Sequence, residues 1–292
     1  MLDIHWLKTF VTLARFKHFG KTANALHMTQ PNVSLQIKQL ERATKVKLVE
    51  RSPFRLTQAG LRLLESSERT LLELKVCQAD LNAFNELGRG TLTIAVSDII
   101  SRALLIKPFQ KFKAQYPGID FILLNTTSSQ ASELVKSAEA DLGFVISQKQ
   151  SQPLHFTKLQ KVSWCALGND FHLKIKQNHK QNDELTLVLL GHDTRTRELI
   201  DEGLPQLQLP NYRVMEVGSV DAQIDWAEAG FGVAIIPEFA ISTKPYLKSE
   251  ITLLPDFSST SLGYVVRQNQ VLSTAMKQLL KWVDEEINHS KS

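Results

Sequence analysis

The first 60 residues place apolar side chains at spacings of three and four, a pattern typical of short amphipathic helices. We expect a first helix over residues 3–16, with Asp3 as its cap, and a second over 21–27 after a break at Gly20. A third helix is expected to begin at Pro31, which suits a first helical position because proline has no N–H to leave unpaired. Two short helices joined by a tight turn predict a helix-turn-helix.

A polar turn and a long helix are expected next. Residues 48–56 read as a hairpin around a proline-containing turn, which beside a helix-turn-helix forms a wing. Thr57 is expected to cap a helix over 58–87, whose broken heptad-like stripe needs a partner to cover it. The stripe consists of Leu61, Leu64, Leu71, Leu72, Val76, Ala79, Ala83 and Leu87. Gly88 and Gly90 are expected to end this helix and to link it to the next region.

From residue 91 onward strands and helices alternate, which predicts an α/β body with largely parallel sheets. The expected strands are 91–96, 119–124, 142–146, 162–167, 185–190, 212–217, 232–236 and 262–267. The expected helices are 101–115, 130–139, 196–202, 220–229, 238–242 and 274–287. This stretch is longer than one small sheet needs. We therefore expect two subdomains with a cleft between them.

Charge is divided unevenly along the chain. The whole sequence has 34 Lys and Arg against 30 Asp and Glu, a net charge of +4. Residues 1–58 hold ten basic and three acidic side chains, a net +7, whereas the remainder holds 24 basic and 27 acidic ones, a net −3. A basic segment joined to a mildly acidic body indicates a small module for a polyanion partner.

Composition excludes several classes of protein. With 43% hydrophobic residues, 13 Gly and 10 Pro, the chain is neither disordered nor fibrous. No apolar run reaches the roughly 18 residues that span a bilayer, and polar residues near the start argue against a signal peptide, so we expect no membrane partner. Cys77 and Cys165 lack the spacing of a zinc site or a disulfide framework. We expect a cytoplasmic protein with no bound metal.

Helical spacing gives the third helix a polar, basic face opposite its buried stripe. The buried stripe is Val33, Ile37 and Leu40, and the opposite face holds Pro31, Ser34, Leu35, Lys38 and Arg42. The two basic side chains can reach phosphates, Ser34 a base edge or a phosphate, and Leu35 a thymine methyl group. Gln30, at the helix start, can bond adenine through both amide atoms. Any one of these residues fits an ordinary solvated helix face, but the turn, the wing and the +7 charge together favour DNA binding.

The motifs of this segment resemble the winged helix-turn-helix of LysR-type transcriptional regulators. The matching motifs are Ala23-x-x-Leu26, Thr29-Gln30-Pro31-x-Val33-Ser34, Leu40-Glu41 and Leu56-Thr57-x-Ala59-Gly60, in that order. The match is close over residues 4–60 and looser beyond. It implies a DNA-binding domain over 1–58, a linker helix over 59–88 and an effector-binding domain over 91–292. That last domain would contain two Rossmann-like subdomains similar to periplasmic solute-binding proteins. The first would span about 91–161 and 266–292, and the second about 162–265.

The resemblance also implies DNA contacts and partners. It adds Pro31 and Asn32 to the contacts at the helix start, and it gives minor-groove contact to Arg51 and Arg55 of the wing. Leu35 departs from the family, in which many members have a basic or polar residue at that position. The implied partners are double-stranded DNA, a small-molecule effector and further copies of the chain. These copies would form a dimer through the linker helix and a tetramer from two dimers, with RNA polymerase as a further candidate partner.

The same resemblance places the effector site on loops that follow strands. The candidate residues are Ser97, Asp98, Ser101, Thr126, Thr127, Ser147, His192, Thr194 and Arg195. Hydroxyl-rich loops at strand ends are where open α/β sheets bind ligands, although such residues also serve as helix caps and turn formers. Asp98 favours a cationic or neutral effector and Arg195 an anionic one, which leaves the effector's charge open.

An alternative is a solute-binding or redox-sensing protein whose N-terminal helices serve assembly only. Cys165 is the redox candidate, but a buried structural thiol is the simpler interpretation because no second cysteine lies near it in sequence. An enzyme has little support. Gly230-Phe231-Gly232 lacks the third glycine of a dinucleotide fingerprint, and His192-Asp193 has no nucleophile motif nearby. We expect no catalytic residue and no cofactor.

Overall fold

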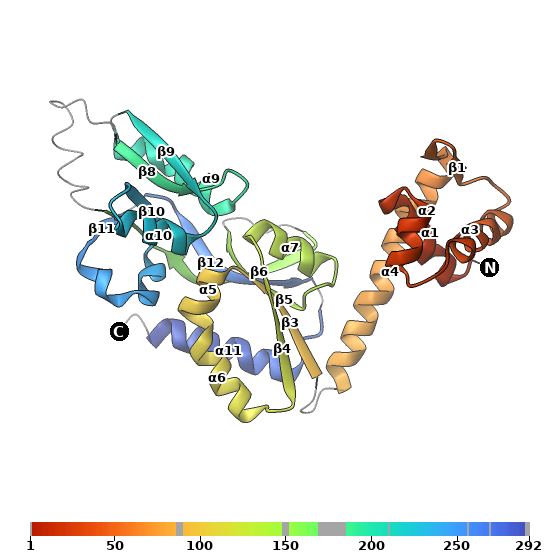
Figure 1. The fold of residues 1–292 in the computed structure, drawn as a ribbon. Coiled ribbons are helices and arrows are strands. Elements are labelled where there is room, and N and C mark those ends of the chain that lie inside the picture. Colours follow the sequence, from red (N-terminus) through yellow and green to blue (C-terminus); the bar gives the residue numbers. More distant parts are fainter. Residues whose placement is uncertain are drawn as a thin grey trace. The chain divides into compact units, whose positions relative to one another are not determined.

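The chain divides into two compact units, which are described separately (Figure 1). The first unit spans Met1–Leu81 and the second Asn82–Ser292. The computed structural model describes residues 2–85, 90–147, 152–168, 185–209, 211–255, 257–268 and 270–289. Within the second unit the chain folds around two sheets, and these two sheets define two subdomains.

The first unit has the expected helix-turn-helix and wing. Its elements are α1 (Ile4–Phe16), α2 (Phe19–Ala25), α3 (Gln30–Thr44), β1 (Val49–Arg51) and β2 (Phe54–Leu56). Asp3 caps α1 as predicted, because its carboxylate accepts a hydrogen bond from the His5 N–H at 2.7 Å. The predicted break at Gly20 is wrong. The ring Nδ1 of His18 accepts hydrogen bonds from the N–H groups of Gly20 and Lys21 (3.1 and 3.3 Å), and this cap starts α2 two residues earlier.

The core of the first unit contains the stripe predicted for α3. Val33, Ile37 and Leu40 are fully buried. Ile37 and Leu40 belong to a buried cluster that also contains Leu7, Phe10, Leu13, Leu48 and Val49. The carboxylate of Glu41 accepts hydrogen bonds from the N–H groups of Leu48 and Val49 at 2.8 and 3.3 Å. The same helix that presents the basic face thus holds the first strand of the wing in place.

A long helix, α4 (Gln58–Asn85), follows the wing. Thr57 caps it as predicted, since its Oγ1 accepts a hydrogen bond from the Gly60 N–H at 3.0 Å. Gly60 lies so close to the segment before the wing that a Cβ on it would be 2.2 Å from the Leu48 carbonyl oxygen. The end predicted for this helix, at residues 87–88, lies outside the described residues.

The second unit contains two five-stranded mixed sheets in its described part. The first, in the order β4-β3-β5-β12-β6, consists of β3 (Gly90–Val96), β4 (Ile119–Asn125), β5 (Leu142–Ser147), β6 (Leu154–Val162) and β12 (Thr260–Arg267). The second, in the order β11-β7-β10-β8-β9, consists of β7 (Trp164–Leu167), β8 (Leu185–Leu190), β9 (Tyr212–Val217), β10 (Val233–Pro237) and β11 (Ile251–Leu254).

The prediction of largely parallel sheets is only half right. β3 runs parallel to β4 and β5, and β8 runs parallel to β9 and β10. β12 and β7 each run antiparallel to both of their neighbours. The reason is topological, because β7 and β12 enter their sheets directly from the other sheet and not through a crossover helix. β6 and β11 are edge strands that the sequence pattern missed.

The chain passes between the two sheets twice. Ser163 makes the first crossing between β6 and β7, and residues 255–259 make the second between β11 and β12. All of β12 pairs with β5 and β6, which moves the boundary predicted near residue 266 back to this segment. Subdomain I therefore comprises the described residues of 90–162 and 260–289, and subdomain II comprises those of 164–254.

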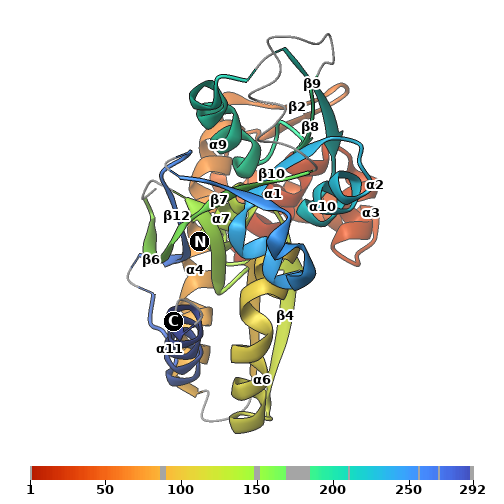
Figure 2. The ribbon, with the colours of Figure 1, turned by 90° about the vertical axis from the view of Figure 1, so that its left-hand side faces the viewer.

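Helices pack on the sheets of both subdomains (Figure 2). Those of subdomain I are α5 (Asp98–Ile100), the π-helical turn η1 (Ser101–Leu105), α6 (Ile106–Gln115), α7 (Ser128–Lys136) and α11 (Thr274–His289). Those of subdomain II are α9 (Arg195–Gly203), α10 (Val220–Glu228) and the 3₁₀ turns η2 (Leu204–Leu207), η3 (Glu238–Thr243) and η4 (Pro245–Ser249).

Subdomain I is a three-layer arrangement. Helices α6 and α11 lie side by side, with the rings of Phe112 and Trp282 6.2 Å apart (Figure 2). Along β3, Ile94 belongs to the core cluster that contains these rings, whereas its neighbour Ala95 belongs to the cluster that contains Val135 of α7. Because successive strand residues point to opposite faces, α7 covers the face opposite to α6 and α11.

Gly60→Ala is expected to destabilise the first unit. The added Cβ would lie 2.2 Å from the Leu48 carbonyl oxygen, a backbone atom that can move little. We expect a net loss of about 1–2 kcal/mol, because overpacking of roughly 1–3 kcal/mol exceeds the roughly 1 kcal/mol that alanine gains in a helix. Urea unfolding followed by circular dichroism measures this loss. Gly218→Ala is the matched control, since no atom lies within 4 Å of its added Cβ, and equal unfolding midpoints for the two variants would contradict the expected clash.

Candidate nucleic-acid interface and effector pocket

The face of α3 opposite the core consists of the residues predicted for it. Gln30, Pro31, Asn32, Leu35, Lys38 and Arg42 are exposed, and Ser34 is half-buried. Leu35 is 51% exposed, which leaves its methyl groups accessible. Within three helical turns this face therefore presents the apolar Leu35, the hydroxyl of Ser34 and two basic side chains. The amides of Gln30 and Asn32 lie beside them at the helix start.

Arg51, at the end of β1, is held against the helix-turn-helix. Its Nη1 donates a hydrogen bond to Ser34 Oγ at 3.0 Å, and its guanidinium carbon lies 5.2 Å from the centre of the Phe19 ring. Phe19 packs edge-on against Phe54 of β2, with ring centres 6.5 Å apart. These contacts join the wing to α2 and α3. Arg55, on β2, is exposed.

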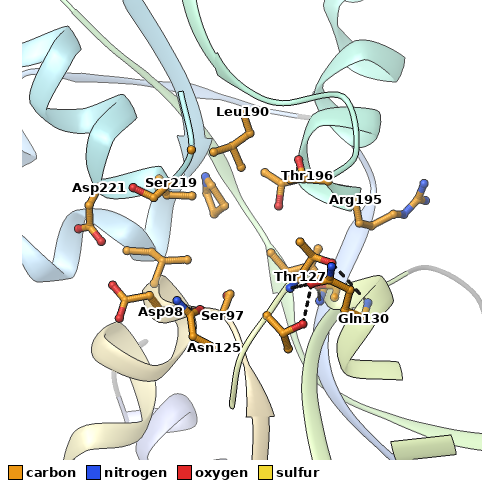
Figure 3. A pocket seen from close by; sticks show the side chains of 18 residues that line it. Ser97, Asp98, Asn125, Thr127, Gln130, Leu190, Arg195, Thr196, Ser219 and Asp221 are labelled. Carbon is orange, nitrogen blue, oxygen red and sulfur yellow. Dashed lines mark hydrogen bonds between the residues drawn. The ribbon is translucent and has the colours of Figure 1, made fainter. Parts of the chain in front are cut away.

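A cavity of about 270 Å³ lies between the subdomains at the ends of the parallel strands (Figure 3). Ser97 follows β3, Thr126 follows β4 and Gly218 follows β9, and all three residues line the cavity. The apolar part of the wall is formed by Ile99, Ile146, Leu190, Val220 and Pro237. The cavity is near the small end of the roughly 300–1,000 Å³ typical of ligand sites, which fits a metabolite-sized molecule.

Four described helices begin at this pocket, and each has a hydroxyl residue as its N-cap. The caps are Ser97 for α5, Thr127 for α7, Thr194 for α9 and Ser219 for α10. Thr194 Oγ1 accepts from the Arg197 N–H at 3.2 Å, and Thr127 forms a reciprocal capping box with Gln130. Helix N-termini carry partial positive charge and unpaired N–H groups, so this geometry suits polar ligands that accept hydrogen bonds.

Six of the nine predicted effector residues lie together in the wall of this pocket. They are Ser97, Asp98, Thr126, Thr127, Thr194 and Arg195. Ser101 and His192 lie outside the lining. The Ser101 hydroxyl donates to the Asp98 carbonyl at 2.8 Å within its own helix, and the His192 ring nitrogen Nε2 lies 3.2 Å from Glu216 Oε1. The side chain of Ser147 lies outside the described residues.

Other polar lining residues were missed by sequence reasoning. They are Asn125, Gln130, Thr196, Ser219 and Asp221. Ser219 stands between a predicted strand and a predicted helix, the same pattern that pointed to Ser97, and Gln130 completes a Thr-x-x-Gln capping box. Asp221 gave no local signal, because its place in the pocket depends on how subdomain II folds against subdomain I.

Two carboxylates and one guanidinium meet at one end of the pocket. Arg102 Nη1 lies 2.8 Å from Asp221 Oδ2 of α10 and 3.4 Å from Asp98 Oδ2, so the arginine joins the two subdomains. Burial raises the pKa of Asp221, Arg102 opposes that rise, and the nearby Asp98 adds to it. Because Arg102 and Asp98 are about half exposed, pairs of this kind stabilise by only about 0–1 kcal/mol, and the bridge can open at little cost.

Arg195 does not bring an unpaired positive charge into the pocket. Its Nη1 lies 2.6 Å from Glu198 and 3.8 Å from Glu202, both on its own helix. Figure 3 shows the guanidinium turned away from the other labelled side chains. Arg195 therefore does not neutralise the negative charge of Asp98 and Asp221.

Two family models match the chain. Residues 4–61 match the bacterial regulatory helix-turn-helix protein of the lysR family, and residues 85–288 match the LysR substrate binding domain. This chain belongs to the LysR family of transcriptional regulators. Regulators of this family bind DNA and small-molecule effectors, and they oligomerise.

Similar proteins align with this chain over nearly their whole length. The HTH-type transcriptional regulator CitR of Bacillus subtilis is 29% identical over 90% of this chain and 91% of its own. The uncharacterized HTH-type transcriptional regulator YfeR of Shigella flexneri is 27% identical over 97% and 93%. A full-length OxyR variant from Pseudomonas aeruginosa has a TM-score of 0.63 at 18% identity, covering 97% of this chain and 98% of that one. Full-length CbnR in complex with its target DNA has a TM-score of 0.59 at 19% identity, covering 97% and 99%. These structures support the fold.

The cysteines of this LysR-family chain give the redox alternative no support. Cys165 is fully buried on β7, and burial, with a smaller contribution from Glu238, raises the pKa of its thiol to about 12. Cys77 is exposed on α4.

Within the described residues, no group of three or more His, Cys, Asp or Glu could hold a metal ion. No helix in the described part of the chain has the length and apolar character to cross a membrane.

Cys165 is expected to resist alkylation in the folded protein. Iodoacetamide reacts with the thiolate, and a thiol with a pKa of about 12 is almost entirely protonated at pH 8. In a Cys77→Ser variant, mass spectrometry is expected to find no labelled thiol in the native state and one per chain after unfolding in urea. Labelling of the native variant at the rate of a free thiol would refute this inert state and reopen a redox role.

Proposed function

We propose that this LysR-family chain is a sequence-specific DNA-binding regulator controlled by a small molecule bound between subdomains I and II. The observation that carries the proposal is the α3 face, which presents the half-buried Ser34 and the exposed Leu35 and Lys38 opposite a fully buried stripe in the basic part of the chain. DNA contacts of this kind combine phosphate binding by basic side chains with base contacts from a helix in the major groove.

The proposed domain roles follow the sequence. Residues 1–58 bind double-stranded DNA, 59–88 form the dimerisation helix and 91–292 bind the effector. The proposed DNA contacts are Gln30, Pro31, Asn32, Ser34, Leu35, Lys38, Arg42, Arg51 and Arg55. The fold shared with CbnR, whose solved structure includes its target DNA, supports this role for the first unit. The chain is proposed to act in the cytoplasm without a catalytic residue or cofactor, with RNA polymerase as a further partner.

Apolar residues of α4 support the proposed dimer. Leu74 and Leu81, which the predicted stripe left out, are 47% and 53% exposed. They continue the stripe of Leu64 and Leu71 at alternating spacings of three and four, through Ser67 and Gln78. This heptad spacing is typical of a helix that packs along a second helix. We infer a homodimer through α4 and a tetramer made of two such dimers.

The proposed mechanism is a population shift between arrangements of the two subdomains. The pocket walls come from both subdomains, and in the described part of the chain these are connected through Ser163 and through the segment between β11 and β12. A ligand that contacts both walls stabilises one angle between the subdomains. In a tetramer this angle sets the spacing of the paired DNA-binding domains and hence the bend of the DNA.

Loss of two α3 side chains is expected to weaken DNA binding. The DNA probe is a duplex enriched from a random library by the wild-type chain, and affinity is measured by fluorescence anisotropy from 50 to 200 mM salt. Ser34→Ala with Lys38→Ala should lower affinity roughly tenfold or more. The log–log salt slope should also fall by about 0.9 for each lost phosphate contact.

Lys281→Ala is the matched control, because it removes an exposed lysine from α11 of the second unit. It is expected to leave the affinity and the salt slope unchanged. If the α3 double variant bound like wild type, or if wild-type binding were insensitive to salt, the proposed DNA interface would be wrong.

Charges on the apolar stripe of α4 are expected to separate the subunits. Leu74→Glu with Leu81→Glu would place two carboxylates on each helix of the pair, a cost that hydrophobic contact cannot offset. Sedimentation velocity is expected to show monomers for this variant. Arg69→Glu, which lies on the opposite side of α4 by helical spacing, should leave the assembly intact. An unchanged oligomer for the Leu74/Leu81 variant would place the interface elsewhere.

A further inference from the structure

The effector pocket has acidic side chains at one end and uncharged polar side chains at the other, where α7 and α9 begin (Figure 3). Asp98 and Asp221 lie at one end, and Thr127, Gln130 and Thr196 lie at the other. The first turns of the helices that begin at the pocket show the same uneven placement of acidic residues. Helices α5 and α10 have Asp98 and Asp221 in their first turns, whereas α7 has no acidic residue there.

The acidic end has one more negative than positive group. Arg102 Nη1 bonds Asp221 at 2.8 Å and lies 3.4 Å from Asp98, so a single guanidinium serves two carboxylates. Asp98 comes from subdomain I and Asp221 from subdomain II. This end therefore attracts a further cation, and a cation bound there contacts both subdomains.

The other end attracts an anion. The N-terminus of α7 points its dipole at the pocket without a local carboxylate, and its capping box uses the Gln130 N–H but leaves the earlier N–H groups of the first turn available. At α9, Glu198 is the acidic residue of the first turn, and its charge is paired with Arg195 at 2.6 Å. One of these helices belongs to each subdomain, as at the acidic end.

We propose that the effector is a small zwitterion, an amino-carboxylate compound. Its ammonium group binds between Asp98 and Asp221, and its carboxylate binds at the N-termini of α7 and α9. This inference rests on the proposed function, because it names the chemical class of the effector for the same pocket. A cavity of about 270 Å³ holds a molecule of this size. A dipolar ligand contacts a helix of each subdomain at both of its ends, so it stabilises the closed arrangement more than a ligand with one charged group.

The effect of removing Arg102 distinguishes a zwitterionic effector from an anionic one. In the structure its guanidinium lies where the ammonium group binds, so it competes with the ligand for Asp221. Removing the arginine should therefore strengthen the binding of an amino acid. An effector with only negative charge predicts the opposite, because Arg102 would then be its counter-ion. The sign of the Arg102 effect separates the two classes of effector.

The first experiment uses the full chain and thermal shift, since a ligand that binds the folded state raises the melting temperature, and at equal concentration a tighter ligand raises it more. The probes are the twenty protein L-amino acids. Each amino acid that stabilises the chain is then compared with its 2-hydroxy acid, which lacks the ammonium group, and with its amine, which lacks the carboxylate. Stabilisation by at least one amino acid and by neither of its analogues at the same concentration is the expected result.

The second experiment measures the affinity of the best amino acid by calorimetry for four variants. Asp221→Asn should weaken binding roughly tenfold or more, and Asp98→Asn should also weaken it. Arg102→Gln should strengthen binding roughly twofold to fivefold. Asp225→Asn is the matched control, because Asp225 lies one turn further along α10, pairs with Lys244 and is not in the pocket lining. The melting temperature of each ligand-free variant shows whether it is folded, and the analogue series on the wild-type chain is a test that needs no variant.

Three results would overturn the proposal. They are no stabilisation by any amino acid, equal stabilisation by a hydroxy acid, and weaker binding by Arg102→Gln. In each case duplex binding by the same full-length chain is measured separately. Intact, Lys38-dependent duplex binding would leave the regulator function standing while the zwitterion fails. Loss of duplex binding would refute the function itself.

Discussion

The structure of the second unit depends on one constraint, which is that the chain crosses from one sheet to the other twice. Because the chain leaves the first sheet at Ser163 and returns through 255–259, the carboxyl ends of the parallel strands of both sheets meet at one cavity. A helix follows each of β3, β4, β8 and β9, so four helices start at the same place. The polar character of the pocket is thus a result of topology, and it requires only a hydroxyl at each helix start.

The side chains at the starts of these helices then determine how charge is distributed in the pocket. Acidic residues in the first turns of α5 and α10 place two carboxylates at one end of the pocket, and α7 has no acidic residue in its first turn. Arg102 lies between the acids of two subdomains through a half-exposed pair of small energy, so the bridge favours one arrangement without locking it. A regulator needs this balance, because a ligand shifts an equilibrium only by its difference in affinity for the two states.

Local features of the fold could be read from the sequence, and features that depend on distant contacts could not. The stripe of Val33, Ile37 and Leu40 follows from helical period alone, and Thr57 follows from capping chemistry. The antiparallel entry of β12 depends on which sheet the chain has just left, and the pairing of Arg102 with Asp221 joins residues 119 positions apart. The start of α2 was misplaced for a different reason, because a histidine supplied the cap where Ser, Thr, Asp or Asn is usual.

The bond between Arg51 and Ser34 changes how the charge of the first unit is understood. Of the ten basic residues in the first 58, four lie on α3 or the wing, and one of these four, Arg51, is already engaged by Ser34 and Phe19. The guanidinium therefore ties the wing to α3, and in the proposed interface the exposed Lys38, Arg42 and Arg55 add positive charge for phosphates. The other basic residues add a field that attracts any duplex without selecting among sequences. In the proposed interface, selection depends on Gln30, Ser34 and the exposed Leu35, whose side chain can contact a methyl group but cannot form a hydrogen bond.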